Sequence, residues 1–262
     1  MGPCGGAIGG MMMHHLAVVS LKGGTGRTTV AANLGALLAE RLRTLMVDLD
    51  PQNALGLALG MPVGEGLGLA TPELDHTTLG SLLRSHQAAI PYIPFGRQDP
   101  DGVAALEQQL RTDSHWLERK LRQLAPSGYD IAVFDTPARQ SPWLHQALQI
   151  ATVVVVVLEA CPLSYALLPE VEAIVNDLSK RPGYRRTFYL LNRVDARRTL
   201  SRDVRAAISN IAGPLLVEAV LPDDEHVREA IANRTTCVRW APHAQFAAAL
   251  RDVATQVLEA VR

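Results

Sequence analysis

Lysine and cysteine are both scarce in this chain, which limits the chemistry it can perform. Only three of its 25 basic residues are lysines, namely Lys22, Lys120 and Lys180. The three cysteines, Cys4, Cys161 and Cys237, are far apart and form no C-x-x-C pair, so a zinc ribbon, a redox pair and an iron–sulfur site are excluded. An odd and sparse cysteine count is typical of a reducing compartment, and we expect a cytoplasmic protein.

Long apolar runs and excess charge are also missing. No apolar run reaches the roughly 18 residues that a membrane span needs, and the longest, 151–158, predicts a buried strand. The net charge of −1 does not indicate a globally basic binder of nucleic acid.

The 262 residues favour a single α/β domain, which we expect to cover residues 16–262. Residues 1–15 are rich in glycine and methionine and lack lysine and arginine, so they do not resemble a signal peptide. We expect a disordered leader, or an upstream start codon with Met11, Met12 or Met13 as the true start.

Residues 16–51 are the most informative stretch. A short apolar run (16–21) leads into a glycine-rich turn, a helix (28–40) and a second apolar run (44–49). Gly23, Gly24 and Gly26 allow backbone angles closed to other residues, so that N–H groups can converge on an anion. The first turn of the following helix adds unpaired N–H groups and the positive end of its dipole.

This turn fits the P-loop pattern G-x-x-x-x-G-K-[ST] with one departure, because Arg27 fills the lysine position. Thr28 stands where a magnesium-binding hydroxyl belongs, and Lys22 precedes the first glycine. Asp48 and Asp50 follow the second apolar run, and Asp135 ends another (129–135). In parallel sheets, ligands bind beyond the carboxyl ends of strands.

The rest of the chain alternates between strand and helix patterns, which predicts right-handed crossovers and a mostly parallel sheet. Residues 55–75 show no clear period and predict a mobile surface excursion. We expect further strands at 90–95 (near an edge), 152–158, 188–191 and 217–221, and further helices at 78–85, 103–124, 165–178, 201–211 and 243–261. The last helix lacks the basic face of a membrane-surface helix, so we expect it to pack on the sheet.

The loop with its early Lys22, together with the Asp135-Thr136-Pro137 segment, resembles the deviant P-loop of the ParA/MinD ATPases. The resemblance implies a P-loop NTPase fold of the SIMIBI/MinD-like type, with helices on both faces of a twisted sheet, and it implies ATP and Mg²⁺ as cofactors. The implied nucleotide-binding residues are Gly23, Gly24, Thr25, Gly26, Arg27, Thr28, Thr29, Asn192, Arg193, Pro222 and Asp223.

The resemblance also assigns roles to the charged residues. Lys22, Asp48 and Asp50 are the implied catalytic residues: Lys22 would reach the phosphates of a dimer partner, and Asp50 would orient the attacking water. Thr28, Asp50 and Asp135 are the implied metal site. Arginine and lysine are not interchangeable at a phosphate, so Arg27 predicts intact nucleotide binding but slow hydrolysis.

Three later stretches, 164–169, 192–204 and 241–247, narrow the resemblance to the BcsQ (YhjQ) family, encoded with bacterial cellulose synthase. It implies an ATP-dependent homodimer that assists assembly or polar placement of the cellulose-secretion machinery. The protein partners would be components of the synthase complex. They would recruit the dimer to the inner face of the membrane or to the cell pole, without direct insertion.

Two other functions remain open. A ParA-type DNA-partition ATPase would use an arginine cluster to bind phosphate backbone, although a solvated helix face or an acidic protein partner accounts for it better. The cluster comprises Arg181, Arg185, Arg186, Arg193, Arg197, Arg198, Arg202 and Arg205. The third possibility is a non-hydrolysing scaffold that ATP locks as a dimer.

Overall fold

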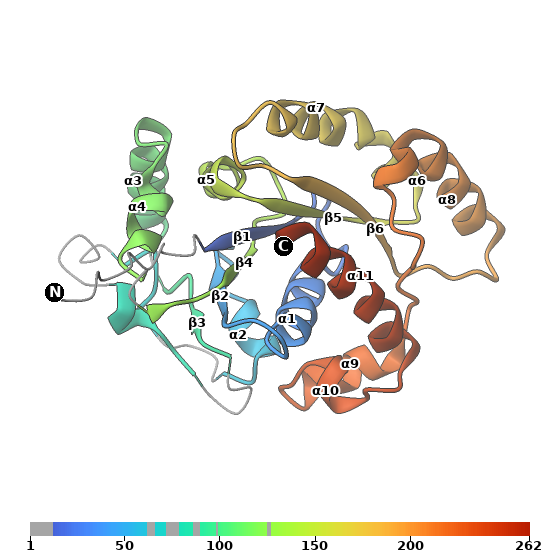
Figure 1. Ribbon diagram of the computed structural model, residues 1–262, viewed down its shortest axis with the longest axis horizontal. Coiled ribbons are helices and arrows are strands. Elements are labelled where there is room, and N and C mark those ends of the chain that lie inside the picture. The colour runs from blue at the N-terminus through green and yellow to red at the C-terminus, as the bar shows by residue number, and fades with distance from the viewer. Residues whose placement is uncertain (1–12, 62–65, 72–78, 86–89, 98, 125–126) are drawn as a thin grey trace, which may run out of the picture.

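The computed structural model describes residues 13–61, 66–71, 79–85, 90–97, 99–124 and 127–262. Its centre is a parallel sheet of six strands in the order β3-β2-β4-β1-β5-β6 (Figure 1). The strands are β1 (His14–Val19), β2 (Thr44–Asp48), β3 (Tyr92–Ile93), β4 (Ile131–Asp135), β5 (Val153–Glu159) and β6 (Arg186–Asn192). The predicted fold class is thereby confirmed, and β3 lies at the edge, as expected.

The register of the strands decides which residues meet at the carboxyl edge of the sheet. β1 lies between β4 and β5, and Asp135 of β4 is level with Val18 of β1 and with Asp48 of β2. On the other side, Glu159 is level with Asn192. The chain order reverses about β1, so this is the switch point at which open α/β sheets bind ligands.

Helices cover both faces of the sheet (Figure 1). They are α1 (Arg27–Leu38), α2 (Leu55–Ala58), α3 (Pro100–Thr112), α4 (Trp116–Arg122), α5 (Pro142–Ile150), α6 (Pro162–Ala166), α7 (Leu168–Ser179), α8 (Thr199–Ala212), α9 (Glu225–Ala232), α10 (Cys237–Trp240) and α11 (Gln245–Val261), with 3₁₀ turns η2 (Leu79–Leu82) and η4 (Gly213–Leu215).

Alternation of side chains along each strand produces two hydrophobic layers. Leu16 and Val18 of β1 face a layer built with α1, α2, α10 and α11, whereas Ala17 and Val19 face one built with α4, α5 and α7. The apolar stripe of α11 is buried against α1 and β5, which agrees with the expected packing of the last helix. None of the helices within the described ranges is long and apolar enough to cross a bilayer.

The predicted helix at 103–124 is wrong as a single element. It divides into α3 and α4 because Asp113 leaves helical geometry (φ −124°, ψ 85°) and its carboxylate accepts from His115 N and Arg119 Nη1. The buried Gln146 amide donates to the carbonyls of Leu110 and Asp113, which satisfies backbone acceptors at the end of α3. The helix predicted at 165–178 is likewise divided, into α6 and α7.

Other boundaries also differ from expectation. β1 begins at His14, so the strand includes the last two residues of the predicted leader; residues 1–12 lie outside the described ones. Residues 217–221 form no strand, although Val217 N and Leu221 N donate to carbonyls of β6. Within the predicted surface excursion, Leu55, Leu69 and Ala70 are buried, whereas residues 62–65 and 72–78 are not described.

Candidate functional site

The glycine loop joins the carboxyl end of β1 to the first turn of α1. Gly24 (φ 76°) and Gly26 (φ 86°) lie in the left-handed region, whereas Gly23 does not, so two of the three predicted glycines meet the backbone requirement. Gly26 is also the residue before the first turn of α1, and no side chain caps that turn. Its N–H groups are therefore available to an anion.

The Asn192 side chain is hydrogen-bonded to the glycine loop. Its Nδ2 donates to the carbonyl of Thr25 at 2.7 Å, and a Cβ on Gly26 would lie 2.4 Å from the same nitrogen. Glycine at position 26 is therefore required both for its angle and for this close approach. Arg193, which itself has a positive φ of 54°, adds a second tie through Nη1 to the carbonyl of Gly24 at 2.6 Å.

The three predicted aspartates gather beside the loop, where β2 and β4 end. Asp48 accepts from the backbone N–H groups of Asp50 and Leu55, each at 3.0 Å, so it shapes the loop after β2. Burial, and secondly the charge of Asp135, raise the pKa of Asp48 well above its ordinary value. Burial raises the pKa of Asp135 to about 6, although Arg27 and a hydrogen bond with Thr28 lower it in part.

Arg27 joins two of these carboxylates. Its side chain is only 7% exposed, with Nη2 lying 2.6 Å from Asp50 Oδ2 and Nε 3.2 Å from Asp135 Oδ1. The residue that departs from the P-loop pattern thus contacts the two acids. This contact between the departing residue and the predicted catalytic acids is not evident from the sequence.

Lys22 is held within its own chain by Glu159, the last residue of β5. Sequence reasoning missed Glu159, although it ends a strongly apolar strand as Asp48 and Asp135 do. The backbone N–H of Glu159 donates to Ser164 Oγ of α6 at 3.2 Å. The predicted reach of Lys22 to a second copy of the chain is a proposal, which requires that Lys22 leave Glu159.

The residues predicted to contact the base do come together. They line one small cleft, whose walls include Asn192, Arg193, Pro222, Asp223, Gly26 and Thr29. Its volume is about 40 Å³, enough for little more than one or two water molecules.

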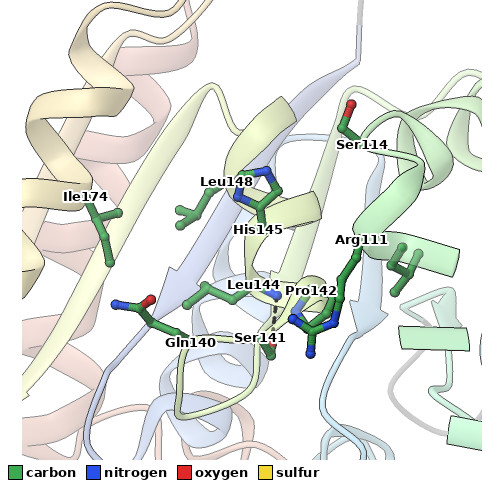
Figure 2. Close-up of a pocket in the computed structure, with 10 residues that line it drawn as sticks. Arg111, Ser114, Gln140, Ser141, Pro142, Leu144, His145, Leu148 and Ile174 are labelled. Atoms are coloured by element: carbon green, nitrogen blue, oxygen red, sulfur yellow. Dashed lines mark hydrogen bonds between the residues drawn. The ribbon is translucent and has the colours of Figure 1, made fainter. Parts of the chain in front are cut away.

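A larger hollow lies elsewhere, between α3, α5 and α7 (Figure 2), with a volume of about 400 Å³. Arg111, Ser141, His145 and Ile174 are among its lining residues. Figure 2 shows the Ser141 side chain beside Leu144, whose N–H donates to it at 3.1 Å at the start of α5. The hollow contains none of the predicted nucleotide-binding residues, so size alone does not identify the site.

The donor set fits a magnesium ion that is completed by phosphate and water. Asp135 Oδ2 is buried and has no hydrogen-bond partner, which leaves an anionic oxygen beside Thr28 for a metal-bound water. No group of three His, Cys, Asp or Glu side chains in the described part of the chain could hold a metal alone. Such a site is typical of Mg²⁺, which keeps several waters and binds substrate phosphates.

The arginine cluster is divided by the fold. Arg186 begins β6 and Arg193 follows its last residue, so the two parts lie at opposite ends of a seven-residue strand, roughly 20 Å apart. Arg197 and Arg198 both pair with Asp195. The cluster is therefore not one continuous basic patch.

Taken together, the parallel sheet, the glycine loop and the strand-end aspartates define the class as ParA/MinD-type P-loop ATPases. Residues 13–258 match the family model described as cellulose biosynthesis protein BcsQ. The chain belongs to the BcsQ family, and the predicted family is confirmed.

Similarity to one protein agrees with this class, and two solved structures share the fold. The chain is 30% identical to the chromosome-partitioning ATPase Soj of Thermus thermophilus over 95% of this chain and 97% of that protein. The septum site-determining protein MinD of Pyrococcus horikoshii, solved with Mg-ADP, superposes with a TM-score of 0.73 at 24% identity, covering 94% of this chain and 96% of that one. Cobyrinic acid a,c-diamide synthase of Mycobacterium smegmatis, solved with an ATP analogue and magnesium, gives a TM-score of 0.76 at 24% identity over 95% of each chain.

Proposed function

We propose that the protein is an ATP-binding, slowly hydrolysing molecular switch that dimerises with ATP and assists assembly or placement of the bacterial cellulose-secretion machinery. The observation that carries the proposal is the convergence of the glycine loop with Asp48, Asp50 and Asp135 at one edge of the sheet. The BcsQ family match supports the cellulose pathway.

Each group of the chain has a role that follows from its position. The N–H groups of the loop from Gly23 to Thr28 hold the phosphates, because the start of α1 attracts anions. Thr28 and Asp135 would hold the metal, and Asp50 would orient the attacking water. When bound, Mg²⁺ neutralises charge on the phosphates and polarises them.

Arg27 supports slow hydrolysis. In its described position, both Nε and Nη2 contact carboxylates. Rotation toward the phosphates requires these two contacts to break, and a guanidinium does not reproduce the compact charge of a lysine.

Adenosine is proposed as the nucleoside on the family resemblance alone. In this proposal Asn192, Pro222 and Asp223 surround the purine. Asn192 Nδ2 is already committed to the Thr25 carbonyl, so its Oδ1 is the atom that remains to accept from a ligand. Lys22 acts across the dimer in this proposal, after its release from Glu159.

Binding and turnover can be tested on the purified chain with a matched pair of variants. Asp135→Asn removes the metal-side charge, whereas Asp130→Asn alters an aspartate just before the same strand that pairs with exposed Arg43. We expect Mg·ATP binding, measured by calorimetry, to weaken at least tenfold in Asp135→Asn and to stay unchanged in Asp130→Asn. Equal affinities in all three proteins would contradict the assigned site.

The cellulose role needs a cellular test. The same two variants, placed at the native locus of the source organism, should differ in secreted cellulose: Asp135→Asn should reduce it and Asp130→Asn should not. If deletion of the whole gene leaves cellulose secretion unchanged, the pathway assignment is wrong although the ATPase assignment stands.

DNA partition is the second candidate, and the similarity to Soj over 95% of the chain favours it. It predicts that the ATP-bound protein is retained on double-stranded DNA at low salt and released as salt is added. The division of the arginine cluster by β6 argues against this function. Absence of retention at low salt would remove it.

A non-hydrolysing scaffold is distinguished by product release. If the wild type and Asp50→Ala show the same near-zero rate while ATP still produces a dimer in light scattering, the protein is a scaffold. A measurable wild-type rate that Asp50→Ala abolishes supports the switch.

A further inference from the structure

The Arg27 guanidinium lies where two buried acids meet. Arg27 is the first residue of α1 and is buried, with Nη2 2.6 Å from Asp50 Oδ2 and Nε 3.2 Å from Asp135 Oδ1. Nε and one Nη lie on the same edge of the planar guanidinium, so a single edge spans a carboxylate from the loop after β2 and one from the end of β4. A lysine, with one nitrogen, has no such edge.

The charges around Arg27 are unbalanced. Asp48, Asp50 and Asp135 are all buried, and Arg27 is the one basic side chain paired with any of them among the described ion pairs. Backbone N–H groups occupy both oxygens of Asp48, but Asp135 Oδ2 has no partner. Buried carboxylates are costly unless a positive charge is close, so the cluster needs a cation whether or not a nucleotide is present.

The contacts of Arg27 fall on the same acids that the proposed metal site uses. Asp135 would hold a metal-bound water and Asp50 would orient the attacking water, and each already gives one oxygen to the guanidinium. Two cations held at one carboxylate pair repel each other, and in a buried site that repulsion is weakly screened.

We propose that Arg27 is the resident counter-ion of Asp50 and Asp135, and that a divalent cation and the guanidinium compete for these two carboxylates. Arg27 therefore has to leave them before a metal-bearing nucleotide is held in the loop, so this residue sets the divalent-cation requirement of the bound state. The inference rests on the proposed function for the identity of the metal, but its test uses no nucleotide, so failure of one can be told from failure of the other.

The experiment measures thermal unfolding of the nucleotide-free full chain with and without MgCl₂, at equal ionic strength adjusted with NaCl. Arg27→Met removes the guanidinium and keeps the length of an apolar stem. We expect its Tm to fall by roughly 5–10 °C without Mg²⁺, because two buried carboxylates lose their partner. Mg²⁺ should restore at least half of that loss, because it binds the native site and not the unfolded chain.

The matched control is Arg43→Met. This variant breaks the ion pair between the exposed Arg43 side chain and Asp130. Mg²⁺ should change the Tm of this control and of the wild type by less than about 1 °C, since Arg27 still holds the acids in both. If Arg27→Met does not fold, Arg27→Lys decides: its Mg²⁺-dependent rise in Tm should exceed that of the wild type.

Two results would overturn the proposal. In the first, Mg²⁺ raises the Tm of the wild type as much as it raises the Tm of Arg27→Met. If Arg27→Met does not fold, the same comparison is made with Arg27→Lys. The other is an Arg27→Met protein that Mg²⁺ does not stabilise.

Discussion

Alanine substitution of the three loop glycines separates backbone strain from crowding. Gly24 and Gly26 have similar positive φ values, 76° and 86°, and Gly23 has none. An added Cβ meets nothing within 4 Å at Gly23 or Gly24, but at Gly26 it lies 2.4 Å from Asn192 Nδ2. The loop thus contains a built-in control for each effect.

The expected costs follow from these differences. Gly23→Ala should change the free energy of unfolding by less than about 0.5 kcal/mol. Gly24→Ala should cost about 1–2 kcal/mol, for alanine in the left-handed region. Gly26→Ala should cost a further ~1–3 kcal/mol, because the Asn192 amide has to leave the Thr25 carbonyl, a buried acceptor 2.7 Å away.

Urea unfolding of the nucleotide-free proteins measures these differences. In an Asn192→Ala background, the extra cost of Gly26→Ala over Gly24→Ala should shrink, because the crowding atom is gone. Equal costs at positions 24 and 26, or an unchanged gap in that background, would refute the assigned contact.

Three further predictions concern charged groups. Arg27→Lys should raise ATP turnover about 10²-fold in a phosphate-release assay, because it supplies the missing transition-state contact, whereas Arg43→Lys should not; no gain at position 27 would contradict the proposed cause of slow turnover. Glu159→Gln frees Lys22 from a partly exposed pair, so ATP-dependent dimerisation measured by light scattering should tighten roughly fivefold, and weaker dimerisation would exclude release of Lys22 as a step. Burial lowers the pKa of His15 to about 4, whereas the unfolded chain titrates near 6.5 and takes up the proton first. Wild-type stability should therefore fall by about 2 kcal/mol more than that of His15→Gln between pH 7 and pH 5 in urea unfolding, and parallel losses would show that His15 is not the responsible group.

The packing of the His15 ring was not evident from the sequence. It follows a glycine- and methionine-rich segment, yet its ring stacks on Phe134 at 5.6 Å and its Nδ1 lies 3.2 Å from the Ile150 carbonyl. The first contact depends on pairing of β1 with β4 and the second on pairing of β1 with β5, and both pairings are long-range events. Local composition therefore placed the start of the domain two residues late.

The main site was predictable because its residues end apolar strands. Asp48 and Asp135 are level in the sheet because the carboxyl ends of parallel strands lie at the same edge. The partners of the loop were not predictable, because nothing in the local pattern says that Lys22 meets Glu159 or that Arg27 turns toward Asp50. Side-chain pairing between segments more than 20 residues apart depends on the packed structure.

The predicted helix boundaries were wrong where a polar side chain ended a helix although the apolar spacing continued. Leu106, Leu110, Leu117 and Leu121 keep a helical spacing across residues 103–124, yet Asp113 stops α3 by binding its own neighbours. Residues 217–221 have the apolar character of a strand, but they make only isolated backbone contacts with β6.

Direct binding of Mg·ATP to the purified chain tests the central claim. Calorimetry of the wild type beside Gly26→Ala should give one ATP per chain for the wild type and much weaker binding for the variant, since the variant distorts the loop against Asn192. Failure of the wild type to bind ATP at millimolar concentration, or equal binding by both proteins, would contradict the account.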